Sequence, residues 1–408
     1  MQTRKTSLMV AVVGLLTTFV AFASPDERIV TVPFSNEEEP FSFMVILGPS
    51  DGEFVWAPAT VRVDPQGRYI YVLSMGSGQT ISLDVKKRKL LADFTFPPIS
   101  SVDTNGNLWS VGFRIDQKNE QSVEGNIFHI RSYDEITFHL YVATPFGHKK
   151  THEELGQEYE WIKEIRLDGR DMGYRLMYFV DLAKLGGRHY LLYSAVDENG
   201  NSMIIDMKER DAVLNLGKNI VGFDNVFVRG ELLYFWKTGE CKTEKRSRIT
   251  QKQYLGAQLR ETTISSYGGR RIEVYSLRER KRVREYTLPA SGQLSADETR
   301  VGESSAPIRL DGRGHHYVEV IPDRSEWKLL QTNFGDMYVS PRLILEYDHA
   351  GRFVGVRCQV YCPHFMGLEG PKSYWDVDAE GNIYYLKWTN KGVEVWKSPV
   401  QKRASQPK

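Results

Sequence analysis

Few residues in this chain could do chemistry, and they are scattered. Cys358, Cys362 and His364 lie close together and offer the sulfur and nitrogen ligands that bind zinc. A zinc site needs three or four such ligands, and this spacing is not the Cys-x-x-Cys-His pattern that attaches haem. His148 and His152 stand four residues apart, so two histidines on one helix could share a metal there. Neither group is complete, and the sequence predicts no metal and no cofactor.

The histidines also have simpler interpretations. Thr151 is the better helix N-cap, which places His148 outside the helix. His315 and His316 are neighbours on an expected strand, so they point to opposite faces and at most one faces inward. A hydrogen-bonded core histidine is the interpretation we prefer. The sequence contains no Gly-x-Ser-x-Gly, no His-Glu-x-x-His and no phosphate-binding glycine loop.

What the sequence does repeat is a turn in which aspartate is followed three residues later by glycine and then by an apolar, β-rich run. Clear copies begin at Asp64, Asp103 and Asp378, and looser copies begin at Asp197, Asp311 and Asp348. The carboxylate accepts a hydrogen bond from a backbone N–H two residues on, and the glycine takes the positive φ that closes the hairpin. Because one hairpin cannot bury its own apolar face, the repeat predicts stacked copies around a shared core.

The strands around these turns form six units. The sixth unit, which begins near residue 374, lacks one strand, while residues 28–34 offer a spare strand at the N-terminus. A ring closes best if that strand completes the last unit and removes its open edge. The sequence therefore predicts an all-β, six-bladed β-propeller closed by an N-terminal strand. Two stacked β-sandwiches are the alternative, but sandwiches do not repeat one turn signature this often.

Two segments carry a family resemblance. Residues 373–385, Ser-Tyr-Trp-Asp-Val-Asp-Ala-Glu-Gly-Asn-Ile-Tyr-Tyr, resemble the inner hairpin of NHL-type and TolB-like six-bladed propellers. Residues 345–353, Leu-Glu-Tyr-Asp-His-Ala-Gly-Arg-Phe, are similar to their outer hairpin. The resemblance covers most of residues 30–400 and is clear in units one, two, five and six. It implies an architecture, while the functions of such propellers range from protein, glycan and RNA binding to metal-dependent lactonases and lyases.

The N-terminal residues are expected to be a targeting segment. Arg4 and Lys5 precede an apolar run from Leu8 to Val20, and residues 21–23, Ala-Phe-Ala, have the pattern that signal peptidase reads. We expect a signal peptide at residues 1–23, one propeller domain at 24–400 and a disordered tail at 401–408, with the mature protein secreted or periplasmic. An uncleaved N-terminal anchor is the alternative. Without residues 1–23 the chain has 51 basic and 52 acidic residues, which argues against nucleic-acid binding.

Three insertions are expected on one face of the ring. Each lies either in a loop between strands two and three of a unit or in a link to the next unit, and such loops and links share one face. Residues 147–175 link units two and three, and Thr151 and Glu154 form a capping box for a short helix. Residues 237–270 are basic and polar, and residues 322–342 carry aromatic side chains. Long loops on a rigid scaffold often carry function, so this face is the expected binding surface. Tolerated surface elaboration is the alternative.

The sequence does not decide whether the cysteines form a disulfide. With three cysteines, at least one thiol is unpaired. If Cys358 and Cys362 lie on one extended strand they are about 13 Å apart and cannot bond. A disulfide then needs a turn between them, or pairing of either with Cys241.

The function that the sequence favours is non-catalytic binding of a protein, peptide or glycan on the face that bears the insertions. Aromatic and basic side chains in or near its loops are the expected anchors: Trp56, Trp236, Trp327, Lys372, Tyr374 and Trp375. Packing between blades is the alternative for Trp236 and Trp375. The rival function is a metal-dependent hydrolase or lyase. By resemblance to propeller lactonases, its axial ligands would be Glu53, Asp224, Asn225 and Asp376.

Overall fold

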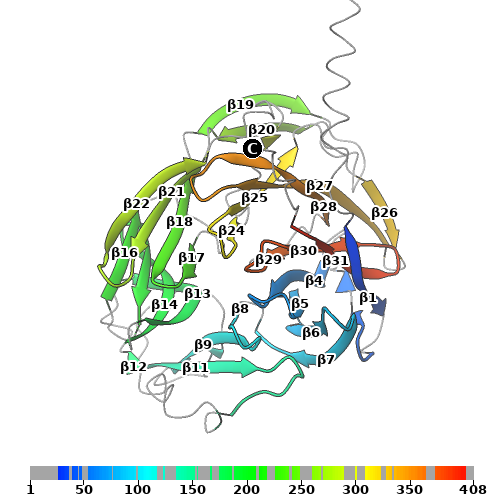
Figure 1. Cartoon of the computed structure of the whole chain (residues 1–408), viewed down its shortest axis with the longest axis horizontal. Helices are drawn as coiled ribbons and strands as arrows, with labels where there is room; N and C mark the ends of the chain where they lie inside the picture. The colour runs from blue at the N-terminus through cyan, green and yellow to red at the C-terminus, as the bar shows by residue number, and fades with distance from the viewer. Residues whose placement is uncertain are drawn as a thin grey trace, which may run out of the picture.

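The chain folds into a ring of six β-sheets around a central axis (Figure 1). The structure is a computed structural model, and it describes residues 26–35, 39–44, 46–47, 54–75, 77–97, 100–116, 123–124, 135–151, 154, 166–167, 174–185, 188–207, 211–217, 226–238, 241–248, 260–267, 270–288, 299–300, 308–322, 328–332, 335–363 and 373–400. Within these ranges no helix is both long and apolar enough to cross a lipid bilayer.

The first three blades follow one another along the chain. Blade 1 contains β3 (Ile46–Leu47), β4 (Phe54–Val63), β5 (Tyr69–Met75), β6 (Gln79–Asp84) and β7 (Lys89–Thr95). Blade 2 contains β8 (Ser101–Val102), β9 (Leu108–Asp116), β10 (Val123–Glu124), β11 (Glu135–Ala143) and β12 (Arg166–Leu167). Blade 3 contains β13 (Tyr174–Leu185), β14 (Arg188–Asp197), β15 (Ser202–Asp206) and β16 (Asp211–Gly217).

The second half of the ring carries the larger additions. Blade 4 contains β17 (Val226–Arg229), β18 (Leu232–Thr238), β21 (Arg270–Ser276) and β22 (Lys281–Leu288), with a separate hairpin of β19 (Cys241–Arg248) and β20 (Arg260–Tyr267). Blade 5 contains β23 (Thr299–Arg300), β24 (Ile308–Leu310), β25 (His316–Pro322), β26 (Lys328–Thr332), β27 (Gly335–Tyr347) and β28 (Phe353–Pro363). Blade 6 contains β29 (Trp375–Val377), β30 (Ile383–Trp388), β31 (Gly392–Ser398), β1 (Glu27–Ser35) and β2 (Phe43–Met44).

Blade 6 closes the ring with strands from both ends of the chain. Strand β1 pairs antiparallel with β31, from Glu27 opposite Lys397 to Pro33 opposite Gly392. Val32 of β1 and Val393 of β31 are both wholly buried. The predicted closure by an N-terminal strand is therefore confirmed, and β1 covers the edge that β31 would otherwise expose.

The repeated turn has the predicted geometry. In all six copies the glycine N–H donates to the aspartate carbonyl oxygen at 2.8–3.1 Å, and the glycine φ lies between 66° and 91°. In the copy at Asp378, Oδ1 accepts from the N–H groups of Glu380 and Asn382 at 3.0 and 2.9 Å. The carboxylate thus satisfies backbone donors that the hairpin leaves free, and glycine is needed because other residues rarely adopt this φ.

The core consists of apolar layers between neighbouring blades. Tyr190 and Leu192 of blade 3 pack against Leu233 and Phe235 of blade 4. The largest cluster joins blades 5, 6 and 1, and its wholly buried members include Trp375. Each sheet therefore buries both faces against its neighbours, as a propeller requires.

The expected helix between blades 2 and 3 lies mainly outside the described residues. The structure describes Glu154 as helical, and both bonds of the capping box are present: Thr151 N–H donates to Glu154 Oε2 at 2.7 Å, and Glu154 N–H donates to Thr151 Oγ1 at 3.4 Å. Chiefly the Thr151 N–H lowers the pKa of Glu154 to about 2. His148 precedes this turn and contacts Glu154 Oε1 through Nε2 at 2.7 Å, so it lies outside the helix as predicted.

His316 makes the stability of the layer between blades 4 and 5 depend on pH. Its side chain is buried, its Nε2 is hydrogen-bonded to the Tyr286 hydroxyl, and burial lowers its pKa to about 4. The unfolded chain therefore binds more protons between pH 6.5 and 4, so folding stability falls as pH falls through that window.

We expect His316→Gln to remove about 3 kcal/mol of the stability difference between pH 7 and pH 4. Glutamine keeps a polar partner for Tyr286 but does not titrate. Urea denaturation of both proteins at a series of pH values measures the difference. Parallel stability curves for the two proteins would contradict this assignment.

Candidate functional site

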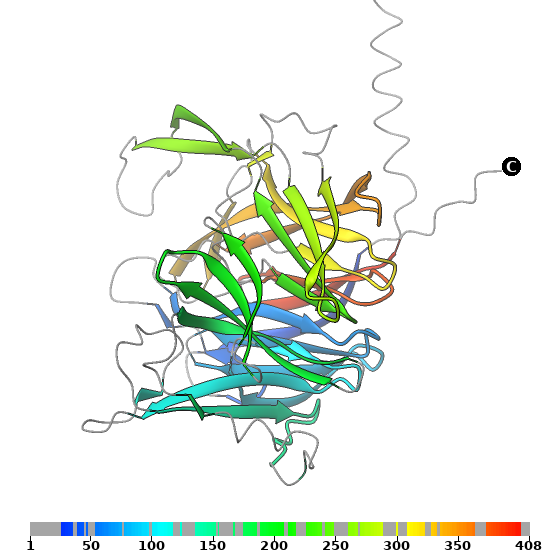
Figure 2. The same ribbon diagram turned by 90° about the vertical axis from the view of Figure 1, so that its left-hand side faces the viewer.

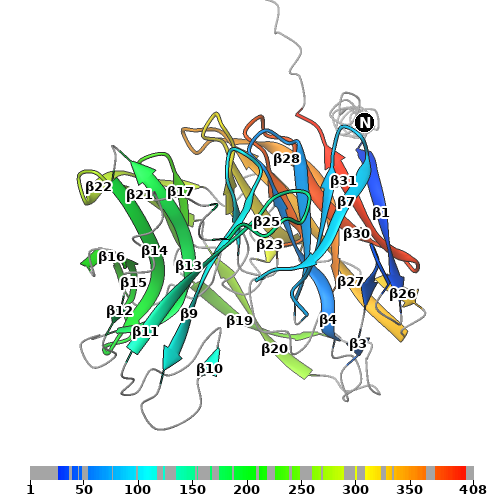
Figure 3. The same ribbon diagram turned by 90° about the horizontal axis from the view of Figure 1, so that it is seen from below.

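The ring has two unlike faces (Figure 3). We call the face with the first-to-second and third-to-fourth strand turns the turn face, and it carries five of the six Asp-x-x-Gly turns. The other face, the insertion face, holds the second-to-third loops and the links between blades. The β19–β20 hairpin lies on the insertion face, and Figure 2 shows it projecting away from the blades. The copy of the turn at Asp197 joins β14 to β15 and so also lies on the insertion face.

The hairpin leaves the blade without interrupting it. Thr238 at the end of β18 pairs directly with Arg270 at the start of β21, and the hairpin is the chain between them. Its own two strands pair from Cys241 opposite Tyr267 to Arg248 opposite Arg260. In blade 5, β26 pairs with the extended first part of β27 in the same way. These additions are grafted onto complete blades.

The structure corrects two of the predicted anchors. Trp375 is wholly buried and Tyr374 is 6 % exposed, so neither side chain can meet a ligand on the surface. The reason is that β29 is an inner strand and lies between β24 of blade 5 and β4 of blade 1. Trp56 and Trp236 lie in β4 and β18, opposite Ile46 and Ile272. Trp327 and Lys372 lie outside the described residues.

Trp375 is instead part of a buried polar cluster. Its indole Nε1 donates to Glu319 Oε2 at 2.8 Å, and Arg342 Nη1 donates to Glu319 Oε1 at 3.2 Å. The guanidinium of Arg309 lies over the Trp375 ring, 5.9 Å from its centroid. Each oxygen of the Glu319 carboxylate therefore accepts a hydrogen bond, which offsets the free-energy cost of burying the charge.

Asp376 lies on an inner strand, as expected of an axial ligand, and its carboxylate accepts three hydrogen bonds. Its Oδ1 accepts from Arg309 Nε at 3.1 Å and from its neighbour Val377 N–H at 2.9 Å, and its Oδ2 accepts from Val63 N–H at 3.0 Å. Glu53, Asp224 and Asn225 lie outside the described residues. Within the described ranges no three His, Cys, Asp or Glu side chains come together as metal ligands would.

Other inner-strand polar groups also link neighbouring blades. Arg62 Nε donates to the Ser100 carbonyl oxygen at 2.9 Å, which joins blade 1 to blade 2. Ser101 Oγ donates to Asp181 Oδ1 at 3.4 Å, which joins blade 2 to blade 3. These groups therefore connect neighbouring blades.

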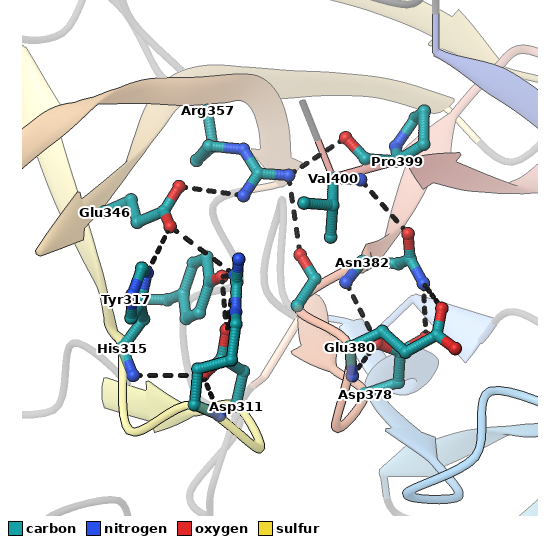
Figure 4. A network of polar contacts seen from close by, with 12 residues as sticks. Asp311, His315, Tyr317, Glu346, Arg357, Asp378, Glu380, Asn382, Pro399 and Val400 are labelled. Carbon is teal, nitrogen blue, oxygen red and sulfur yellow. Dashed lines mark hydrogen bonds and ion pairs between the residues drawn. The ribbon is translucent and has the colours of Figure 1, made fainter. Parts of the chain in front are cut away.

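The densest polar network lies on the turn face between blades 5 and 6 (Figure 4). Glu346 accepts from Arg357 Nη1 at 2.8 Å and contacts His315 Nδ1 at 2.6 Å. Arg357 Nη2 also donates to the Pro399 carbonyl oxygen at 3.0 Å, and Val400 N–H donates to Asn382 Oδ1 at 3.1 Å. The network thus ties the end of the last strand to two blades.

His315 and His316 diverge as the strand period predicts. His316 faces blade 4 and is buried, whereas His315 is half-buried within the network on Glu346. Tyr317 then points back into the network, and its hydroxyl donates to Asp311 Oδ2 at 3.0 Å. The prediction of one core histidine is confirmed.

Sequence reasoning missed an aromatic donor six residues after the turn aspartate. Trp109 Nε1 donates to Asp103 Oδ2 at 2.7 Å. The hydroxyl groups of Tyr317 and Tyr384 donate to Asp311 and Asp378 at 3.0 and 3.1 Å. The signal was present in the sequence as Asp, Gly at the fourth position and Trp or Tyr at the seventh. In blade 1 the seventh position is Ile70, and Arg68 Nε donates to Asp64 at 2.9 Å instead.

The structure excludes one of the possible disulfides. Cys358 and Cys362 both lie on β28, opposite Ile344 and Ser340 in an unbroken register, so the two cannot bond to each other. Cys358 is a free, buried thiol, and burial raises its pKa. Cys241 begins β19 on the insertion face.

The comparisons with known proteins add no assignment of activity. No family model matches the chain, and no curated protein matches it in sequence. Among solved structures, it is similar to Kuenenia stuttgartiensis hydrazine synthase, with 9 % identity and a TM-score of 0.36 over 88 % of this chain and 97 % of that one. It is also similar to the Myceliophteria thermophila Cps50 (Swd1) β-propeller domain, with 10 % identity and a TM-score of 0.35 over 92 % of this chain and all of that one. These scores are too low to carry an argument about function, so we base the description on the strand topology, which is that of a six-bladed β-propeller.

Proposed function

We propose that this protein is a rigid, non-catalytic scaffold that binds a protein, peptide or glycan partner on its insertion face. The observation that carries the proposal is the combination of a closed ring with grafted strands on one face. The β1–β31 pairing fixes the blades, and the β19–β20 and β26–β27 hairpins extend from complete blades. A closed ring holds its loops in place before a partner arrives, which lowers the entropy lost on binding.

The donor set of Asp376 weighs against the rival enzyme function. Its carboxylate accepts from Arg309, Val63 and Val377, which are the interactions of a structural aspartate. A metal-dependent hydrolase would keep an acidic ligand open to the ion. Metal analysis of the purified protein tests this point directly, and one divalent ion per chain would overturn the proposal.

The proposal includes export. A signal peptide at residues 1–23, cleaved near Ala23, would leave a mature protein that meets its partner outside the cytoplasm. N-terminal sequencing of protein recovered from the medium or periplasm should start at Ser24.

Excision of the β19–β20 hairpin tests the binding face. Because Thr238 and Arg270 are paired partners, an Asn-Gly turn can replace residues 239–269 and close β18 onto β21. We expect the melting temperature to stay within about 2 °C of the parent, because in a domain of this size that shift corresponds to less than about 2 kcal/mol. Binding to ligands selected by the full chain from a displayed peptide library and a glycan array should be lost.

Arg352→Ala is the control on the turn face, where this side chain is 78 % exposed. It should leave the selected ligands bound as tightly as before. Loss of binding with Arg352→Ala and its retention after excision would instead assign the partner to the turn face.

A further inference from the structure

The turn face carries a concentration of positive charge that the total charge of the chain conceals. The turns between third and fourth strands have charges of +4 in blade 1 (residues 86–89), +2 in blade 2 (residues 144–150) and +3 in blade 4 (residues 278–282). Together these short segments carry +9, whereas the whole chain carries +1. We call these three segments the basic rim. A field of this kind attracts anionic partners however neutral the molecule is in total.

The side chains of the basic rim are exposed. Lys87 and Lys281 are 71 % and 67 % exposed. Acidic neighbours neutralise part of the charge: Lys87 lies 3.5 Å from Asp84, and Lys281 lies 2.7 Å from Glu279. Arg88 and Arg282 also form ion pairs, with Glu27 and Glu285. Lys86, Lys89 and Arg278 make no ion pair with any residue that the structure describes, so their charge is available to a partner.

The arrangement of the rim suits a surface better than a strand of polymer. Blades 1 and 4 lie on opposite sides of the six-membered ring, and blade 2 is next to blade 1, so the charges are spread around one face (Figure 1). A linear polyanion follows a continuous basic track, whereas a planar anionic surface can meet separated clusters at once. A second copy of this face would repel the first because both are positive.

An exposed aromatic ring accompanies the charges. Phe146, in the blade 2 segment of the rim, is 66 % exposed, and its ring packs on Tyr69 with a centroid distance of 6.5 Å. Aromatic side chains beside basic ones are typical of proteins that rest at the membrane interface.

Both ends of the ring also lie at the turn face. Strand β1 starts there at Glu27, opposite Lys397 near the end of β31. Residues 401–408, which follow β31 in the sequence, contain three basic residues and no acidic one.

We propose that the turn face docks on an anionic lipid surface through the basic rim, with Phe146 at the headgroup boundary. Binding is electrostatic in the main and falls as salt is added, because each exposed basic side chain contributes separately and is screened. Docked in this way, the ring directs its insertion face away from the membrane. The docking does not depend on which partner the insertion face binds.

Vesicle sedimentation with the full chain tests the proposal. We compare binding to phosphatidylcholine vesicles that contain about 30 % phosphatidylglycerol with binding to pure phosphatidylcholine vesicles. Binding to the pure vesicles measures any contribution that does not depend on lipid charge, including that of the apolar N-terminal run. We expect tighter binding to the anionic vesicles at about 50 mM salt, and loss of that preference at about 300 mM salt.

A pair of variants locates the contact. Lys86→Gln with Arg278→Gln removes one unpaired charge from each side of the rim and should weaken the anionic preference about 25-fold, at about fivefold per charge. Lys387→Gln with Lys391→Gln is the matched control, because both lysines are exposed in or beside the β30–β31 turn on the insertion face. It should change binding less than about twofold. Melting temperatures confirm that both variants are folded.

Three results would overturn the proposal. The first is equal binding to the two kinds of vesicle, and the second is equal weakening by the two variants. The third is absence of vesicle binding together with salt-sensitive binding to duplex DNA or polyglutamate, which would assign the basic rim to a soluble polyanion. Protection of Lys86, Lys89 and Lys281 from acetylation on addition of anionic vesicles, with Lys387 and Lys391 unprotected, would support it independently.

Discussion

Replacing Gly392 with alanine should open the ring at its closure. Gly392 of β31 pairs with Pro33 of β1, and a Cβ atom at this position would lie 2.2 Å from the Val32 carbonyl oxygen and 2.9 Å from Pro33 Cα. Both neighbours are backbone atoms, so neither can rotate aside, and the two strands must separate. We expect the free energy of unfolding, measured by urea denaturation, to fall by about 3 kcal/mol.

Gly112→Ala is the matched control. Gly112 also lies within a strand, opposite His139 of β11, but a Cβ atom there would meet only the edge of the Tyr141 ring at 3.2 Å. Because that exposed side chain can move, the free energy of unfolding should change by less than about 1 kcal/mol.

Hydrogen exchange separates local opening from general weakening. In Gly392→Ala the amides of β1 and β31 should lose protection first, while those of β5 and β6 keep it. Uniform loss of protection, or equal destabilisation by both glycine substitutions, would argue that closure is not the weak point.

The parts of the fold that could be predicted are those fixed by local chemistry. The residues of the Asp-x-x-Gly turn determine its hydrogen bonds and its positive φ. The turn can therefore be recognised from the sequence of one short segment, such as Asp378 to Gly381. Counting the strands in each unit also shows that the last unit lacks one, and β1 supplies that strand. The fourth strand of blade 3, β16, is hard to recognise in the sequence, because Asp211–Gly217 pairs with β15 through two register shifts and is not purely apolar.

The side-chain partners could not be predicted, because they come from distant segments. Trp375 has the composition of a surface anchor, yet Glu319 and Arg309 lie 56 and 66 positions earlier in the chain and enclose it. Arg357 contacts Glu346 and also Pro399, which follows the last strand of the chain, β31. The neighbouring blade decides which face of an inner strand is buried. A single sequence does not give the spacing between blades, so it does not show which side chains that neighbour covers.

Gly381→Ala should break the junction between blades 5 and 6. Gly381 has a φ of 91°, and a Cβ atom there would lie 2.5 Å from Arg313 Nη2, 2.5 Å from the Tyr317 hydroxyl oxygen and 2.7 Å from Asp311 Oδ2. The substitution therefore adds about 1 kcal/mol of backbone strain and about 2 kcal/mol or more from displacing a satisfied hydrogen bond. Urea denaturation should show a loss of about 3 kcal/mol in the free energy of unfolding.

Gly200→Ala separates the two contributions, because it belongs to the same kind of turn. Its φ is 79°, and a Cβ atom there would have no neighbour within 4 Å among the described residues, so only the strain of about 1 kcal/mol should remain. Gly67 repeats the crowded arrangement one blade on, with Asp378 Oδ2 at 2.6 Å and the Tyr384 hydroxyl at 2.7 Å. Gly67→Ala should therefore resemble Gly381→Ala in cost, and not Gly200→Ala.

A double-mutant cycle identifies the atom responsible. Tyr317→Phe alone should destabilise the protein by about 1 kcal/mol, because Asp311 loses one donor. In the Gly381→Ala background the same change also removes one of the three atoms that the new methyl group meets, so the second substitution should cost less than it does alone. Strict additivity of the two substitutions would mean that the tyrosine hydroxyl is not what the turn glycine accommodates. The spacing of aspartate, glycine and tyrosine in blades 5 and 6 would then reflect turn formation alone, rather than a contact by which each turn locks onto the blade before it.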